Sequence, residues 1–251
     1  MAIVLRKRWD VPQLQNMALS PDGTHLATTH PQSKVVTLWE ISGGTQVQEW
    51  SDSPCPVFAL AFSPDGKHLA YAGANGCMII RRLAPPTDRT FIQDGVFLVR
   101  SLAFSPDSRH LAGATVAEEL PEESDVIVWG ITRGKRVARL DKHPPCAHCL
   151  AFSPDGKLLA VGVHGGFKLW SVKKREPWQA ASFYARQQPG RLTVKRPEGL
   201  PPIDAVTGAA FSPDGKSILL LVRKSELFRW EIDKERVVGH PCRKAEKSWL
   251  M

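Results

Sequence analysis

The sequence predicts an all-β fold that is built from five repeats of one four-stranded unit. Three observations predict it. A phrase of the form Ala-Phe-Ser-Pro-Asp-Gly recurs five times, with copies that begin at Ala18, Ala61, Ala103, Ala151 and Ala210. The prolines of successive copies are 43, 42, 48 and 59 residues apart. Apolar runs flank every copy, and self-similarity at such a period indicates a repeat architecture.

Each repeat predicts four short strands in the same order. The run before the phrase is rich in Val, Leu and Phe, which suits a buried strand. Ser-Pro-Asp-Gly then favours a turn, since Pro presets φ, Asp bonds nearby backbone and Gly accepts positive φ. Second strands are predicted over 26–29, 69–73, 111–115, 158–163 and 218–222. A third run ends in Trp in four repeats and a weaker fourth run follows, so each unit matches a propeller blade.

The third runs carry a resemblance to a known family. VTLWE (36–40), VIVWG (126–130), FKLWS (167–171) and LFRWE (227–231) follow AFSPDG-type phrases in register. The chain resembles the WD-repeat β-propellers of bacterial type over nearly all of its 251 residues. The resemblance implies one propeller domain over 1–240, with a basic tail at 241–251. The expected blades are 11–50, 55–93, 97–140, 146–183 and 205–240, with an additional outer strand at 2–9.

The departures from the family pattern are also informative. The usual blade holds a buried network of Asp, His, Ser/Thr and Trp, and no repeat here has the full set. Arg81 and Arg82 stand where the second repeat should have its Trp. Blade stability is therefore expected to rest mainly on apolar packing. Ser108 replaces the turn glycine of the third repeat, so that turn must be strained or change its type.

The number of strands leaves ring closure open. One outer strand before the first blade, four between blades and one after the last make six outer strands for five blades. Either the ring closes with five blades and displaces a terminal strand, or the chain is part of a larger or partner-completed ring. An open end would expose strand edges that invite pairing with another chain, including an oligomer partner.

Composition predicts a globular protein of the cytoplasm. The chain is 43% hydrophobic and 23% charged, with a formal net charge of +8. The first ten residues hold no apolar stretch that suits a secretory signal, and no run approaches the roughly 20 apolar residues of a membrane helix. Five cysteines without a paired spacing do not suggest a disulfide framework, which favours a reducing compartment.

Most candidate catalytic groups are explained by the repeat. Asp22, Asp65, Asp107, Asp155 and Asp214 occupy equivalent turns, one per blade, so they cannot converge on one substrate. His25, His68 and His110 also share one position. Cys146, His148 and Cys149 form the one cluster of metal-ligand types, but structural zinc requires four ligands. We therefore expect no catalytic residues, no metal and no cofactor, with core packing as the role of that cluster.

Two segments interrupt the repeat and indicate where a partner binds. Residues 117–125 form an acidic loop, and residues 171–200 hold seven Lys or Arg against two Glu. Both are expected on one face, where they either remain solvated, pair with each other or bind a partner, because loops on a rigid scaffold commonly carry binding. The candidate partner-binding residues are Gln32, Lys34, Asn75, Glu122, Glu123, His143, His164, Lys173, Lys174, Arg175, Trp178, Arg186, Arg191, Arg223 and Lys224.

These observations favour a non-catalytic scaffold that presents the loops of a rigid propeller to a peptide or protein partner. The alternative is a docking or regulatory subunit of a larger enzyme assembly. Basic clusters scattered over several blades make nucleic acid a less favoured partner, since no nucleic-acid-binding motif accompanies them. A membrane is not expected to be a partner.

Overall fold

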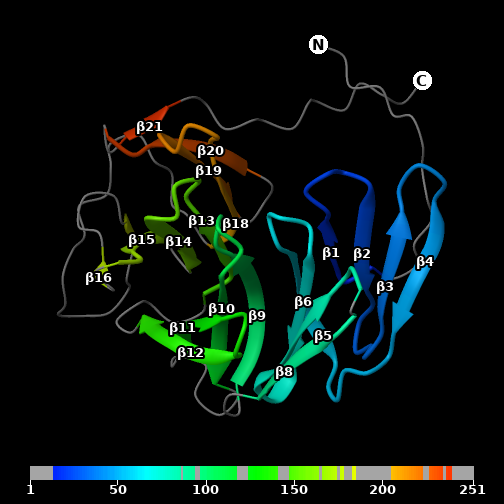
Figure 1. The fold of residues 1–251 in the computed structure, drawn as a ribbon. Helices are drawn as coiled ribbons and strands as arrows, with labels where there is room; N and C mark the ends of the chain where they lie inside the picture. Colours follow the sequence, from blue (N-terminus) through cyan, green and yellow to red (C-terminus); the bar gives the residue numbers. More distant parts are fainter. Residues whose placement is uncertain are drawn as a thin grey trace.

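The computed structural model of the protein describes residues 14–85, 87–93, 97–117, 124–140, 147–163, 166–173, 176–177, 183–184, 205–222, 226–233 and 236–238. Over these residues the chain is almost entirely β-structure (Figure 1). The helical structure in this part is η1 (Ala74–Gly76), a 3-10 helix of three residues. Within the described residues, no helix is long and apolar enough to cross a membrane.

The strands form five antiparallel sheets that follow one another along the chain. The first sheet holds β1 (Asn16–Leu19), β2 (His25–Thr29), β3 (Val36–Glu40) and β4 (Thr45–Trp50). The second holds β5 (Val57–Phe62), β6 (His68–Gly73), β7 (Cys77–Arg82) and β8 (Arg89–Gln93). The third holds β9 (Phe97–Phe104), β10 (His110–Ala117), β11 (Ser124–Gly130) and β12 (Lys135–Leu140).

The last two sheets repeat the same order. The fourth holds β13 (Cys149–Phe152), β14 (Leu158–Val163), β15 (Gly166–Ser171) and β16 (Glu176–Pro177), and β17 (Phe183–Tyr184) also pairs with β15. The fifth holds β18 (Val206–Phe211), β19 (Ser217–Val222), β20 (Glu226–Glu231) and β21 (Arg236–Val238). The predicted propeller architecture of five four-stranded units is confirmed. The expected outer strand at 2–9 and the tail at 241–251 lie outside the described residues.

The turn between the first and second strands is built alike in all five repeats. In the first, the Ser20 hydroxyl donates to Oδ1 of Asp22 at 2.6 Å, and that oxygen accepts the Thr24 N–H at 3.0 Å. These bonds, the one from Ser20 above all, lower the pKa of Asp22 to about 2. Gly23 has a φ of +70°, which a residue with a side chain adopts only at a cost. The residues of the repeated phrase therefore supply the hydrogen bonds and the positive φ that form this turn.

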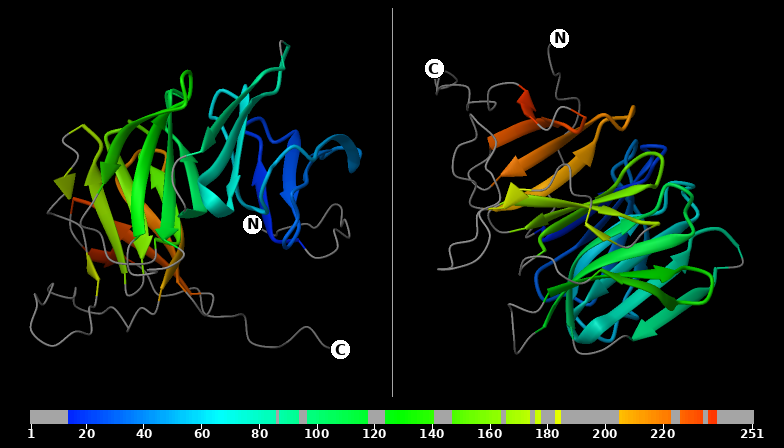
Figure 2. Two further views of the ribbon diagram at one scale, coloured as in Figure 1. Left: turned by 90° about the horizontal axis from the view of Figure 1, so that it is seen from below. Right: turned by 90° about the vertical axis from the view of Figure 1, so that its left-hand side faces the viewer.

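The sheets pack face to face through four hydrophobic clusters, one between each pair of successive sheets. The inner strands β1, β5, β9, β13 and β18 pack against one another in chain order, and β18 makes no comparable contact with β1 among the described residues. Figure 1 shows the first and fifth sheets standing apart, and Figure 2 shows the row of sheets from two further sides. The described part is thus an open arc, and the closed five-blade alternative is not what the structure shows.

The tryptophans of the third strands have a fixed role in this arc. Trp129 lies in the cluster between the second and third sheets, and Trp170 lies in the cluster between the third and fourth. Trp230 packs edge-on against Phe167 of the fourth sheet, with ring centroids 5.6 Å apart. Each of these tryptophans is buried against the preceding sheet.

Ser108 keeps the turn of the third repeat but strains it. Its φ is +56°, and its N–H donates to the Ser105 carbonyl at 2.9 Å, as the glycines do in the other turns. The side chain that causes the strain also gains a contact, because its Oγ accepts the N–H of Asp65 from the turn of the second sheet at 3.1 Å. Of the two outcomes expected from the sequence, strain is the one observed.

Substitutions of Ser108 test whether its positive φ strains the turn and how far the hydrogen bond to Asp65 offsets that strain. Ser108→Ala and Ser108→Gly both remove the hydrogen bond to Asp65, but only glycine relieves the left-handed φ, which costs an L-residue about 1–2 kcal/mol. We expect the glycine variant to exceed the alanine variant in free energy of unfolding by about 1 kcal/mol, measured by urea denaturation. Gly156→Ala, at the equivalent position with φ +69°, should lose a similar amount. Equal stability of the two Ser108 variants would contradict the strain.

Candidate interaction surface

Loops of the first and second sheets meet at one end of the molecule. The N–H of Val57 donates to the Ser33 carbonyl at 2.9 Å, and the N–H of Ala74 donates to the Pro56 carbonyl at 3.4 Å. A Cβ on Gly73 would lie 1.7 Å from that Pro56 oxygen, so only glycine permits this close approach. We call residues 30–35, 53–57 and 73–77 the loop cluster.

The loop cluster holds three polar side chains out to solvent. Gln32 and Asn75 are exposed, with φ of +57° and +55°, and Lys34 is exposed as well. The loop that carries Gln32 and Lys34 is fixed by the bond from the Ser33 N–H to the His30 carbonyl at 3.1 Å. Left-handed non-glycine residues persist where their surroundings hold them, and they are frequent at binding loops. The cluster is therefore a preformed surface of amide and ammonium groups.

The loop cluster also contains two buried cysteines. Cys55 and Cys77 are both buried, and the Ser53 hydroxyl donates to the Cys55 carbonyl at 2.7 Å. Burial raises the pKa of the Cys55 thiol to about 11. A protonated thiol is a poor nucleophile, so this cysteine supports the surface by packing.

The structure brings three of the predicted site residues together and separates a fourth. Gln32, Lys34 and Asn75 share the loop cluster, whereas Lys173 follows β15 and lies at the opposite end, beside the turns of the third and fourth sheets. Their partner-binding role stays a prediction. The other predicted residues lie outside the described part of the chain: Glu122, Glu123, His143, His164, Lys174, Arg175, Trp178, Arg186, Arg191, Arg223 and Lys224.

Grooves open between neighbouring sheets at the end of the molecule that carries the turns between first and second strands. One of about 590 Å³ separates the first and second sheets and is lined by His25, Val47 and Arg82, among others. Another of about 640 Å³ separates the third and fourth sheets and is lined by residues that include Val137 and Lys173. Val47 and Val137 hold equivalent positions in β4 and β12, so the repeat itself produces these grooves.

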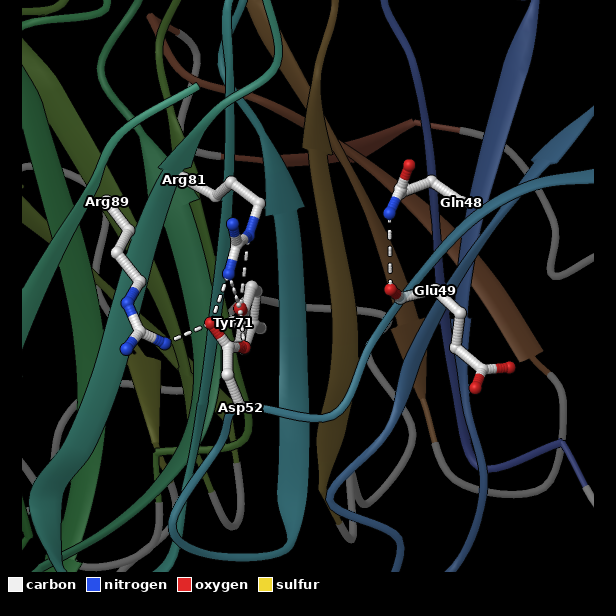
Figure 3. A network of polar contacts seen from close by, with 6 residues as sticks. All are labelled: Gln48, Glu49, Asp52, Tyr71, Arg81 and Arg89. Carbon is white, nitrogen blue, oxygen red and sulfur yellow. Dashed lines mark hydrogen bonds and ion pairs between the residues drawn. The ribbon is translucent and has the colours of Figure 1, made fainter. Parts of the chain in front are cut away.

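A polar network occupies the place of the missing tryptophan in the second sheet (Figure 3). The guanidinium groups of Arg81 and Arg89 both pair with the carboxylate of Asp52, which lies in the connection from β4 to β5. The Tyr71 hydroxyl donates to Oδ1 of Asp52 at 2.7 Å and accepts from Nη2 of Arg81 at 3.2 Å. Arg81 also lies over the Trp50 ring, 5.1 Å from its centroid. The network therefore joins the second sheet to the first.

The pKa shifts in this network agree with its geometry. Burial opposes the charge on Asp52, but the hydrogen bond from Tyr71 and the two guanidinium groups outweigh it and hold the pKa of Asp52 below its usual value of 3.8. Burial, with the hydrogen bond to Asp52, raises the pKa of Tyr71 to about 12. The carboxylate is charged and the phenol is neutral at neutral pH, which is the pair of states that the hydrogen bond requires.

Sequence reasoning identified Arg81 as a departure but missed its partners. Asp52 and Tyr71 are 19 residues apart, and only the packing of two sheets brings them together. The available signal was a single arginine at a position that is otherwise tryptophan. Cys149, in contrast, fulfils its packing expectation: its buried thiol donates to the Val206 carbonyl at 3.7 Å between the fourth and fifth sheets.

The sheet order, the repeated turns and the tryptophan packing define a β-propeller protein of the repeat type. The WD40 family, described as WD domain, G-beta repeat, matches residues 44–80 and 134–171. Repeats of this family generally mediate protein–protein interactions. Together with the relatives described next, these matches show that the chain is similar to WD-repeat proteins.

The chain is similar to WD-repeat proteins of distant organisms. It is 26% identical over 198 residues to the WD repeat-containing protein sll1491 of Synechocystis, covering 79% of this chain and 50% of that protein. It is 29% identical over 143 residues to the WD repeat-containing protein SL1-17 of Schistosoma mansoni, covering 57% of this chain and 44% of that protein. A 46-residue segment is 48% identical to eukaryotic translation initiation factor 3 subunit I of Candida albicans, covering 18% of this chain and 13% of that protein. The chain thus spans about half the length, or less, of these relatives.

Removal of the Asp52 carboxylate should destabilise the protein. Asp52→Ala leaves Arg81 without its carboxylate and the Tyr71 hydroxyl without its acceptor, and breaking a buried ion pair in this way costs about 3–5 kcal/mol, with the lower end expected at this partly exposed pair. Tyr71→Phe should cost about 1 kcal/mol. Asp88→Ala changes net charge equally at an exposed site and should stay within about 0.5 kcal/mol of the wild type. Urea denaturation of the three variants measures these differences.

The effect of Asp52 should also depend on pH. Because its pKa is lower in the folded than in the unfolded protein, its contribution is complete above about 3.8 and is lost as the pH falls through the folded value. The difference in free energy of unfolding between wild type and Asp52→Asn should therefore shrink below pH 3.8. A difference that stays constant down to pH 2 would contradict the ionised pair.

Proposed function

We propose that this protein is a non-catalytic interaction scaffold that binds a protein or peptide partner through the loop cluster. The observation that carries this proposal is the rigid presentation of Gln32, Lys34 and Asn75 by two adjacent sheets. An exposed amide, an ammonium group and a second amide suit a partner segment that offers carboxylates and backbone carbonyls. The similarity to the WD40 family, whose repeats generally mediate protein–protein interactions, supports the same function.

The absence of catalysis is supported by what the polar groups do. Each turn aspartate accepts a hydrogen bond from the serine of its own turn, so the five carboxylates serve five separate turns. Such groups lie around the arc, one per sheet, and do not converge on a common point. Their depressed pKa values follow from these local bonds, for example at Asp155 and Asp214.

We also propose a cytoplasmic location. The three cysteines in the described part, Cys55, Cys77 and Cys149, are buried free thiols. Stability that relies on apolar packing between sheets, with thiols inside, suits a reducing compartment. A role as a docking subunit of an enzyme assembly would use the same loop surface and would appear as a copurifying enzyme.

Affinity purification of the tagged full chain, followed by identification of copurifying proteins, tests the proposed function. The test variant is Gln32→Ala/Lys34→Glu/Asn75→Ala, which changes three exposed side chains and leaves Gly73 in place. The control is Lys157→Glu, since Lys157 is exposed at the opposite, turn end of the fourth sheet. We expect a specific partner to be retained by the control and reduced about tenfold or more by the loop variant. Equal recovery with both variants would overturn the role of the loop cluster.

A further inference from the structure

The four inter-sheet interfaces follow one packing rule. In each, the earlier sheet contributes a fully buried alanine of its second strand, and the later sheet contributes the phenylalanine of its repeated phrase. The alanines are Ala27, Ala70, Ala112 and Ala160, and the phenylalanines are Phe62, Phe104, Phe152 and Phe211. Small residues on one face thus make room for large residues on the next.

The outer face of the first sheet carries the large-residue half of this rule, and no sheet among the described residues covers it. Leu19 stands at the phenylalanine position and is 59% exposed, and Met17 is 59% exposed where Leu60, Leu102 and Leu150 are buried. Trp39 is only half-buried, although the equivalent Trp129, Trp170 and Trp230 are buried against a preceding sheet. Its indole N–H donates to Oγ1 of Thr28 at 2.8 Å, which holds the ring on this face.

The outer face of the fifth sheet carries the other half, and again no described sheet covers it. Leu219 takes the alanine position and is 46% exposed, and Leu221 is 39% exposed where Ala72 and Ala114 are buried. Arg229 is exposed at a position that is Leu38, Ile80, Val128 and Leu169 in the other sheets. Successive strand residues point to opposite faces, so these three side chains share the face that Trp230 does not use.

The two faces match in size at the phenylalanine and alanine positions of the packing rule, and they carry opposite charges. At the other interfaces a phenylalanine meets an alanine, whereas here Leu19 is smaller than phenylalanine and Leu219 is larger than alanine. At this pair of positions the volume lost from one face is regained on the other, as a well-packed interface requires. Glu49 lies on the first-sheet face, because its β-partner Thr37 alternates with the buried Val36 and Leu38. It supplies the charge opposite to that of Arg229.

We propose that these two faces form one interface between two copies of this chain. The fifth sheet of one copy docks on the first sheet of the next in a head-to-tail contact. Contact within a single chain would require the four filled interfaces to repack, and close-packed cores resist such change. The contact is heterologous, so each dimer retains one free face of either type and can add further copies.

Sedimentation of the full chain over a wide concentration range tests this self-association. We expect dimers and larger species that dissociate on dilution. Leu19→Glu and Leu219→Glu should each weaken association about tenfold or more, because either variant buries a charge in the contact. Val47→Glu is the matched control: Val47 is 51% exposed on the first sheet but lines the groove toward the second, so association should be unchanged. A monomer at all concentrations, or equal loss with Val47→Glu, would overturn the proposal.

Mixing the two variants tests the head-to-tail arrangement itself. Leu19→Glu retains a normal fifth-sheet face, and Leu219→Glu retains a normal first-sheet face. The mixture should therefore form a one-to-one dimer that grows no further, whereas each variant alone stays monomeric. Recovery of this dimer also proves that both variants fold. A mixture that remains monomeric would overturn the proposal.

Cysteine cross-linking separates this contact from closure within one chain. Leu19→Cys and Leu219→Cys, made separately and mixed, should form a cross-link between copies that the wild type with its native cysteines does not form. The double variant at high dilution should show no cross-link within one chain. An efficient intrachain cross-link there would indicate a closed five-sheet ring and would refute the intermolecular contact.

Discussion

The packing of each sheet on the next is the constraint on which the rest of this structure depends. A four-stranded sheet of this size cannot bury its apolar side chains alone, and burial of one large side chain contributes about 1.5–3 kcal/mol. Here each interior sheet buries two faces, and the buried alanines and phenylalanines interlock at every boundary. Stability is therefore shared between neighbours, as in other repeat proteins.

This constraint explains how the second sheet packs without the tryptophan that the other sheets carry. The second sheet lacks its tryptophan, and Arg81 fills the position by pairing with Asp52, bonding Tyr71 and lying over Trp50. The arginine contacts the preceding sheet, as the tryptophans of the later sheets do. The contact between the first and second sheets uses the same position as the contacts between the later sheets. A charged network at the rim replaces the buried tryptophan ring there.

The repeat also shows which polar groups belong to the scaffold. Polar groups that recur once per sheet, such as the turn aspartates, form their hydrogen bonds within their own turn. The loop cluster differs because two sheets combine there, with Gly73 admitting Pro56 and non-glycine residues held at positive φ. The terminal faces differ for the opposite reason: they follow the packing rule but lack a neighbour in the described structure.

The sequence by itself determined the repeat, the strand order and the turn chemistry, because these depend on residues that are close together in the chain. It also showed that the turn at Ser108 must be strained or change its type, and the structure decided that it is strained. The sequence also placed Cys149 in the core and recognised Arg81 as an exception. Only the tertiary structure decided that the described sheets form an open arc, that Lys173 lies apart from Gln32, Lys34 and Asn75, and that Asp52 meets Arg81 and Tyr71. These outcomes depend on how one sheet packs on another, and that packing joins residues whose separation along the chain carries no local signal.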